Sequence, residues 1–178
     1  MKKMIVFMCL VFCMAAGEVE AASLVQLSLT PDIALHDRAT RINGVSLNIW
    51  GENPQTAFTL GLVNGSNGSS GGFTLGAFNY ADNYTGFQAA VLNYTEGTLL
   101  GWQVGGFNYT VGSMQGIHLG VINYAGHLKG VQLGGINYAA SASTGIQIGV
   151  VNIIPTNAWF TQFPDQIAPG MVIFNWRF

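Results

Sequence analysis

A chain of 178 residues with 49% hydrophobic residues is long enough for one domain with a buried core, which excludes a disordered chain and a multi-domain enzyme. Charged residues make up only 8% of the sequence and glycine occurs 24 times, which is not the composition of an ordinary soluble domain. The formal net charge of -2 supplies no basic surface for a phosphate backbone, so we expect no nucleic-acid partner.

The first segment, residues 1–22, is predicted to be a secretory signal peptide. A basic start is followed by an apolar stretch from Met4 to about Ala16 and then by small residues that permit cleavage after Ala21 or Ala22. The stretch is short for a bilayer span, and an uncleaved anchor is the alternative. Both cysteines lie in this segment, so the mature chain is expected to have no disulfide and no cysteine nucleophile.

Residues 23–56 lead into the body of the chain, and we expect them to form N-terminal strands or a cap. They hold a degenerate copy, GVSLNIWGE at residues 44–52, of a pattern that then recurs seven times over residues 57–153. The seven copies are AFTLGLVNG, GFTLGAFNY, GFQAAVLNY, GWQVGGFNY, GIHLGVINY, GVQLGGINY and GIQIGVVNI. Their shared asparagine recurs every 14 or 15 residues, at Asn64, Asn79, Asn93, Asn108, Asn123, Asn137 and Asn152.

Each copy has the residue pattern of a β-strand. Apolar residues alternate with small or polar residues at period two, and β-branched and aromatic residues are common. The short segments between copies are rich in the residues of tight turns, Gly, Asn, Asp and Ser. No helical period occurs after the leader, so the fold class is predicted to be all-β.

The phase of the alternation favours a β-solenoid of about 15-residue rungs with flanking caps. The apolar side chains change parity within each copy, and a bend at a central glycine, such as Gly105-Gly106 or Gly134-Gly135, would turn both halves toward one core. We therefore expect the aliphatic residues of the copies to be buried. In such a stack identical residues lie about 4.8 Å apart, so the seven asparagines should form a hydrogen-bonded structural ladder.

The alternative architecture is a ten-stranded antiparallel up-and-down β-barrel. The copies together with residues 24–30, 44–50 and 171–178 would supply ten strands of membrane-spanning length. The C-terminal IFNWRF, which alternates aromatic residues up to Phe178, resembles the C-terminal assembly signal of bacterial outer-membrane β-barrel proteins. Equally short turns and an almost uncharged lumen argue against the barrel. Residues 154–178 would be a closing strand in the barrel and a C-terminal cap in the solenoid.

The repeated string G-x-Q-x-G-x-x-N-Y-A resembles the leptospiral-type surface-repeat proteins found in several bacterial groups. The resemblance covers the lead-in ATRINGVSLNIWG, the seven copies and the exit segment GIQIGVVNIIPTNAWFTQFP. It implies export and an envelope or surface location, leaves the biochemical activity undefined and transfers no catalytic residue.

The histidines and acidic residues show no spacing typical of a catalytic or metal site. We therefore expect no catalytic, cofactor-binding or metal-binding residue and no enzyme activity. His118 is the one histidine inside a copy, where other copies have Gln or Thr, and it makes only a weak pair with His127. The acidic residues are scattered among the lead-in, the turns and the exit segment, which indicates no paired carboxylates for acid-base catalysis.

A series of tyrosines is the candidate interaction face. They follow the repeated asparagines, at Tyr80, Tyr94, Tyr109, Tyr124 and Tyr138. On an exposed solenoid face they could bind a glycan or another surface protein, at barrel rims they would form an interface girdle, and partly buried they would only stabilise the rungs.

The sequence therefore predicts a non-enzymatic, exported cell-envelope or surface repeat protein with a structural or interaction role. Its expected location is the outer membrane or cell surface, with the periplasm as an alternative, and its expected partner is the envelope or outer membrane itself. A small outer-membrane β-barrel acting as a channel or surface anchor is the alternative function.

Overall fold

The computed structural model describes residues 22–178, which form an all-β structure without a helix. The predicted signal peptide, apart from Ala22, lies outside the described residues. The strands are β1 (Ala22–Thr30), β2 (Ile33–Ala34), β3 (Arg41–Asn53), β4 (Thr56–Leu75), β5 (Phe78–Thr95), β6 (Leu99–Ile153) and β7 (Gly170–Arg177). They belong to one sheet in the order β2-β1-β3-β4-β5-β6-β7. No helix long and apolar enough to cross a bilayer occurs within residues 22–178.

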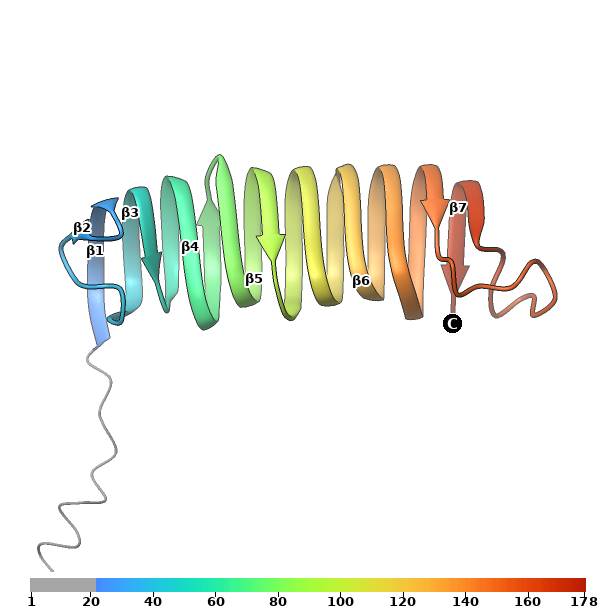
Figure 1. Ribbon diagram of the computed structural model, residues 1–178, viewed down its shortest axis with the longest axis horizontal. Coiled ribbons are helices and arrows are strands. Elements are labelled where there is room, and N and C mark those ends of the chain that lie inside the picture. Colours follow the sequence, from blue (N-terminus) through green and yellow to red (C-terminus); the bar gives the residue numbers. More distant parts are fainter. Residues whose placement is uncertain (1–21) are drawn as a thin grey trace, which may run out of the picture.

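The long strands wind around a common axis as a coil, seen in side view in Figure 1. Each turn pairs in parallel with the next, and the register equals the sequence repeat: Asn64 pairs with Asn79, and Asn93 pairs with Asn108. The predicted β-solenoid is therefore confirmed. The antiparallel barrel considered as its alternative is wrong, because the copies pair in parallel.

The coil begins before the seven copies. Strand β1 pairs in parallel with β3, and β3 pairs in parallel with β4, with Leu47 opposite Leu60. The degenerate copy at residues 44–52 is thus a full rung, and most of residues 23–56 continue the stack. The part of that segment that leaves the coil is residues 31–40, which hold the short strand β2.

The interior of the coil is lined by the polar residues of the repeat, which corrects the predicted direction of the side chains. Gln103 and Asn108 are 0% and 1% exposed, whereas Trp102 and Phe107, from the same copy, are 53% and 47% exposed. The change of parity near Gly105-Gly106 is present as expected. It turns Gln and Asn inward and the large apolar side chains of the copies outward.

The central small residue of each copy explains this direction. A Cβ added to Gly120 would lie 2.5 Å from the carbonyl oxygen of Gly105 and 2.6 Å from Nδ2 of Asn108, so this position faces a crowded interior that excludes most side chains. It holds glycine in most copies and alanine at Ala90. Because side chains alternate along a strand, the Gln two residues earlier must also point inward, and the apolar residue between them must point outward.

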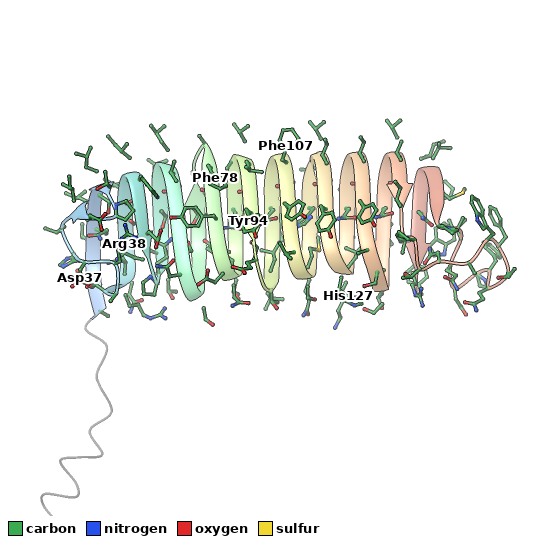
Figure 2. The ribbon with its side chains drawn as sticks, in the orientation of Figure 1. Asp37, Arg38, Phe78, Tyr94, Phe107 and His127 are labelled. Atoms are coloured by element: carbon green, nitrogen blue, oxygen red, sulfur yellow. The ribbon has the colours of Figure 1, made fainter. Side chains whose placement is uncertain are left out.

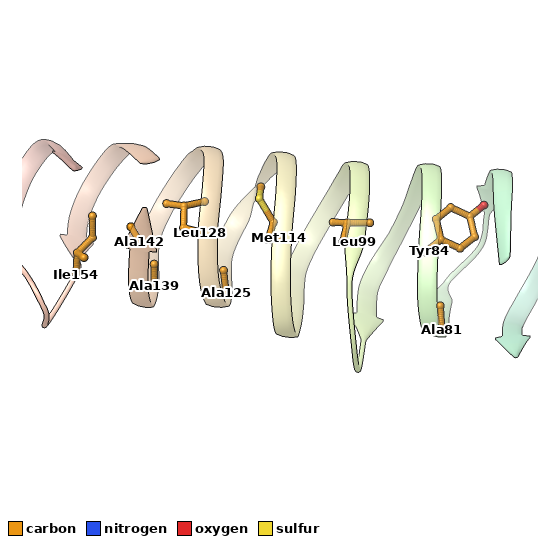
Figure 3. Packing of buried hydrophobic residues seen from close by; sticks show 9 residues of the cluster. All are labelled: Ala81, Tyr84, Leu99, Met114, Ala125, Leu128, Ala139, Ala142 and Ile154. Carbon is orange, nitrogen blue, oxygen red and sulfur yellow. The ribbon is translucent and has the colours of Figure 1, made fainter. Parts of the chain in front are cut away.

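A narrow apolar core lies inside the coil, opposite the polar rows. Its members come from the segments between the copies and, for Ile154, from the residue after the last copy (Figure 3): Ala81, Tyr84, Leu99, Met114, Ala125, Leu128, Ala139, Ala142 and Ile154. These segments were predicted to be turns. Each fully buried Leu or Met side chain contributes roughly 1.5–3 kcal/mol relative to exposure, so the turn segments stabilise the coil as well as connecting its faces.

Both ends of the coil are covered. At the C-terminal end β7 runs antiparallel to the last turn of β6, with Ile148 opposite Phe174 and Ile146 opposite Trp176. At the N-terminal end β2 pairs antiparallel with β1, and the side chain of Gln26 bonds to both backbone groups of His36. These contacts satisfy backbone groups that an open terminal rung would offer to another chain.

Candidate interaction surface

The asparagine ladder is present as a continuous row of side-chain hydrogen bonds. Nδ2 of Asn93 donates to Oδ1 of Asn108 at 2.9 Å, and Nδ2 of Asn108 donates to Oδ1 of Asn123 at 2.8 Å. The same amide of Asn108 also donates to the carbonyl oxygen of Leu119 at 3.0 Å. Equivalent bonds join Asn48, Asn64, Asn79, Asn93, Asn108, Asn123, Asn137 and Asn152. With rungs about 4.8 Å apart, these eight residues span roughly 34 Å of the axis.

A second interior row contains glutamines and is interrupted by His118. Nε2 of Gln103 donates to Oε1 of Gln88 at 2.9 Å, and Nε2 of Gln147 donates to Oε1 of Gln132 at 2.8 Å. His118 lies between these pairs and bonds only to Thr110, at 3.2 Å, and its Nδ1 has no partner among the described residues. Burial lowers the pKa of His118 to about 3, so the ring is neutral.

Four of the five predicted tyrosines form a stack along the outside of the coil (Figure 2). The ring centroids of Tyr109 and Tyr124 lie 4.2 Å apart with an interplanar angle of 8°, and Tyr94 and Tyr138 extend the stack at either end. Ring faces cover one another, so ring edges and hydroxyls face outward. A sugar needs an open ring face to stack on, and inside the stack each face is covered.

Tyr80 has a different environment from the other four. Its hydroxyl donates to the carboxylate of Glu52 and accepts a hydrogen bond of 3.2 Å from the indole of Trp50. Burial, followed by the hydrogen bond to Glu52, raises the pKa of Tyr80 to about 12. Tyr80 therefore links β5 to β3 across the intervening rung of β4.

The largest feature of the outer surface is a set of apolar rows, which we call the apolar face. Neighbouring copies place their outward residues in register, as in the stacked pair Phe73 and Phe87, whose ring centroids are 4.6 Å apart. The first two rows are Val45, Phe58, Phe73, Phe87, Trp102, Ile117, Val131 and Ile146, and Leu47, Leu60, Leu75, Ala89, Val104, Leu119, Leu133 and Ile148. The next two are Ile49, Leu62, Ala77, Val91, Gly106, Val121, Gly135 and Val150, and Trp50, Val63, Phe78, Leu92, Phe107, Ile122, Ile136 and Val151.

The apolar face is strongly exposed. Leu62, Val91, Val121 and Val150 are between 61% and 72% exposed. At the N-terminal end the face forms an open groove of about 870 Å³, lined by Leu27, Leu29, Ile33, Leu35, Leu47, Ile49, Leu60 and Leu62 with the backbone between them. The side chains that line this part of the surface are thus mainly aliphatic.

The opposite side of the coil, which we call the polar edge, is formed by the segments between the copies. Within residues 57–153 the charged residues are Asp82, Glu96 and Lys129, and all three are exposed on this edge. In Figure 2 the side chains along one long edge, near Phe107, are carbon only, and nitrogen and oxygen atoms gather along the other, near His127. The coil is therefore amphipathic around its circumference.

The histidines and acidic residues do not converge on a site. The ring of His127 bonds to the hydroxyls of Ser141 and Ser143 at 2.9 and 3.1 Å, and His118 is enclosed in the interior. Within residues 22–178 no group of three or more histidine, cysteine, aspartate or glutamate side chains is placed to hold a metal ion.

The tyrosines were predicted from the repeat, and the larger apolar face beside them was not. The signal that could have located it is the shared parity of Gln and the central glycine, because a position restricted to Gly or Ala marks a crowded side of a strand. Comparisons with protein-family models, with curated proteins and with solved structures found no match to this chain.

Proposed function

We propose that this chain is a non-enzymatic, exported protein of the bacterial cell envelope that acts by surface contact, in a structural or interaction role. The observation that carries the proposal is the exposure of the apolar face over the length of the coil. Soluble monomers rarely expose continuous apolar patches larger than a few hundred Å², because such patches drive association with whatever can cover them. We therefore expect the apolar face to act by binding a partner that covers it.

The sequence supports the envelope as the place where this occurs. A basic start, an apolar stretch and small residues form the pattern of a secretory signal peptide. The repeat resembles leptospiral-type surface-repeat proteins, and the C-terminal aromatic alternation resembles an outer-membrane assembly signal. Export also suits a mature chain without cysteine, which needs no defined redox environment.

The interior of the coil supports a structural role. Its side chains bond from rung to rung, which holds the residues of the outer surface in a fixed arrangement. The channel expected of the alternative function depended on a barrel, and the coil has a different architecture. Its centre is filled by buried side chains such as Asn108, Gln103 and Leu99.

Cell fractionation tests the proposal. In a Gram-negative host that expresses the full chain, we expect the protein in the envelope fraction, shortened by the length of residues 1–22. We expect the protein to stay with the envelope in 0.5 M NaCl and to be released by detergent, because apolar contact is not screened by salt. A full-length protein that stays in the cytosolic fraction would contradict the proposal.

A further inference from the structure

The identity of the partner that covers the apolar face can be argued from the chemistry of its rows. Across the four rows defined above the side chains are hydrocarbon, apart from the indole nitrogens of Trp50 and Trp102. Protein interfaces carry about one hydrogen bond per 100–200 Å² and a polar rim, which these rows do not offer. A partner that forms no hydrogen bonds fits this surface better than a folded protein.

Side-chain size varies irregularly along each row. Trp102, Ile117 and Val131 follow one another in one row, and Val121, Gly135 and Val150 follow one another in another. A rigid partner would have to match these differences in side-chain size closely, because a void at the contact loses dispersion energy. Fluid acyl chains adapt to such differences without a matched shape, so the rows need only be apolar.

The border of the apolar face has the residue that membranes favour at their interface. Tyr94, Tyr109, Tyr124 and Tyr138 form a fifth row, and beyond it the large apolar rows end: the next outward residues are Glu96, Val111, Gly126 and Ala140. Tyrosine is enriched at the headgroup level, because its ring is apolar and its hydroxyl needs a polar partner. The stack therefore marks the boundary between hydrocarbon and water.

The charges decide how the coil is oriented. A length of roughly 34 Å would be sufficient to cross a hydrocarbon layer about 30 Å thick. However, Asp82, Glu96 and Lys129 lie at intervals along the coil rather than at its ends, and a coil that crossed the bilayer would carry them into hydrocarbon. With the axis parallel to the membrane plane, all three remain in water.

From these observations we infer that the apolar face inserts into the hydrocarbon of one leaflet of a lipid bilayer, with the solenoid axis parallel to the membrane plane, the tyrosine row at headgroup level and the polar edge in water. This inference rests on the proposed envelope role and names the partner of that role. It makes the protein a monotopic membrane protein that is held by a face of a β-coil.

The test is flotation of purified residues 23–178, without the apolar leader that could itself bind lipid, with vesicles of phosphatidylcholine, a zwitterionic lipid that removes charge attraction from the measurement. We expect the wild type to float with the vesicles equally well at 0.1 and 0.5 M NaCl, because hydrocarbon contact is not screened by salt. The double variant Val121→Lys/Val150→Lys places two charges in the most exposed row and should reduce partitioning at least a hundredfold, at tenfold or more per lysine.

The matched control is Thr98→Lys/Thr144→Lys, which adds the same charge to exposed positions on the polar edge. Both double variants should retain the circular dichroism of the wild type, because all four side chains point away from the interior. The control should float as the wild type does. Fluorescence gives a second readout: brominated phosphatidylcholine should quench the wild type more than Trp102→Phe, since Trp102 lies in the apolar face.

Three results would overturn the inference: a wild type that does not float, equal flotation of the two double variants, or a lipid-free dimer that the Val121/Val150 variant dissociates while flotation is unchanged. The last result would assign the face to a second copy of the chain. The assay uses no cell, so its failure is distinguishable from failure of the proposed location. Vesicle binding by a protein that fractionates with the cytosol would leave the lipid contact standing and remove the envelope role.

Discussion

The repeated asparagines connect neighbouring rungs of the coil through side-chain hydrogen bonds. In the ladder each interior amide donates to the next asparagine and to a backbone carbonyl, and its oxygen accepts from the previous asparagine. Such a row satisfies buried polar groups completely, and bonds in a low-dielectric interior polarise one another. The polar interior therefore stabilises the coil as long as no member of the row is missing.

Replacing one member should be costly. Asn108→Leu removes three hydrogen bonds and leaves the amide of Asn93 and the oxygens of Asn123 and Leu119 without this partner. We expect a loss of about 3–5 kcal/mol in the free energy of unfolding, measured by urea denaturation. The exposed Asn43→Leu is the control and should change stability by no more than about 0.5 kcal/mol. Equal losses in the two variants would show that the ladder contributes little.

His118 is the position where the glutamine row can be improved. Oε1 of Gln103 has no partner among the described residues, and a glutamine at position 118 could donate to it as Gln103 donates to Gln88. We expect His118→Gln to raise the free energy of unfolding by about 1 kcal/mol at pH 8. A variant that is less stable than the wild type at pH 8 would contradict this account of the row.

The same substitution should remove a pH dependence. Burial lowers the pKa of His118 to about 3, so between pH 6.5 and 3 the unfolded chain binds a proton that the folded chain does not. Above pH 6.5 the titration of His118 does not change the free energy of unfolding. Below pH 6.5 that free energy falls as the unfolded chain takes up the proton, by about 2 kcal/mol at pH 5. The stability difference between His118→Gln and the wild type should therefore grow on acidification, as measured by denaturation at pH 8 and pH 5. A difference independent of pH would contradict a buried neutral ring.

At the scale of the rung, the glycine that begins each of five copies has a positive φ that other residues rarely adopt; these are Gly72, Gly86, Gly101, Gly116 and Gly130. Gly116 has a φ of +137°, and an added Cβ would lie 2.0 Å from the carbonyl oxygen of Gly101. We expect Gly116→Ala to destabilise the coil by about 3 kcal/mol in thermal or urea unfolding. Gly135→Ala is the control, because its row already holds Val121 and Val150, and it should be nearly neutral. A neutral Gly116→Ala would mean that the backbone there can relax.

The C-terminal strand is expected to keep the coil from associating end to end. Deleting residues 170–178 removes the partner of residues 145–153 and exposes the backbone groups of the last rung. We expect larger oligomers or aggregates than the full chain forms in the same detergent, measured by size-exclusion chromatography with light scattering. A truncated chain that elutes with the oligomeric state of the full chain would contradict the capping role.

The elements were largely predictable from the sequence, and the direction of their side chains was not. The spacing of Asn64, Asn79 and Asn93 gave the rung length, and the doubled glycines located a bend, because both depend on local periodicity. The apolar face was misplaced in the interior because burial of hydrophobic residues was assumed, as is usual for soluble domains. The crowding at Gly120 that reverses this assumption depends on contact between neighbouring rungs.

The candidate site was predicted only in part for a related reason. The tyrosine series followed from the repeat, but the sequence analysis treated its five members as equivalent. Tyr80 instead bonds to Glu52, a residue of the degenerate copy in the segment predicted to form N-terminal strands or a cap. Its separate role depends on a contact between rungs 28 residues apart in the chain, which no local pattern reports.

For the whole molecule, the polar interior is what permits the apolar exterior. Hydrogen bonds along the axis satisfy both the backbone and the interior side chains, so the outer surface needs no water for hydrogen bonding. A hydrocarbon environment would also strengthen the interior network, because it excludes water from one side of a thin coil. The amphipathic circumference is thus the feature by which we propose that the repeat contacts a membrane surface.

The inward direction of the asparagines is the claim on which the rest depends, and hydrogen exchange of their side-chain amides tests it directly, in lipid or in detergent. In protein labelled with ¹⁵N at asparagine, nuclear magnetic resonance should show slow exchange for the ladder from Asn64 to Asn152 and fast exchange for the exposed Asn43 and Asn83. Fast exchange of the ladder amides, at the rate of Asn43 and Asn83, would place them on the outside of the coil and contradict the account.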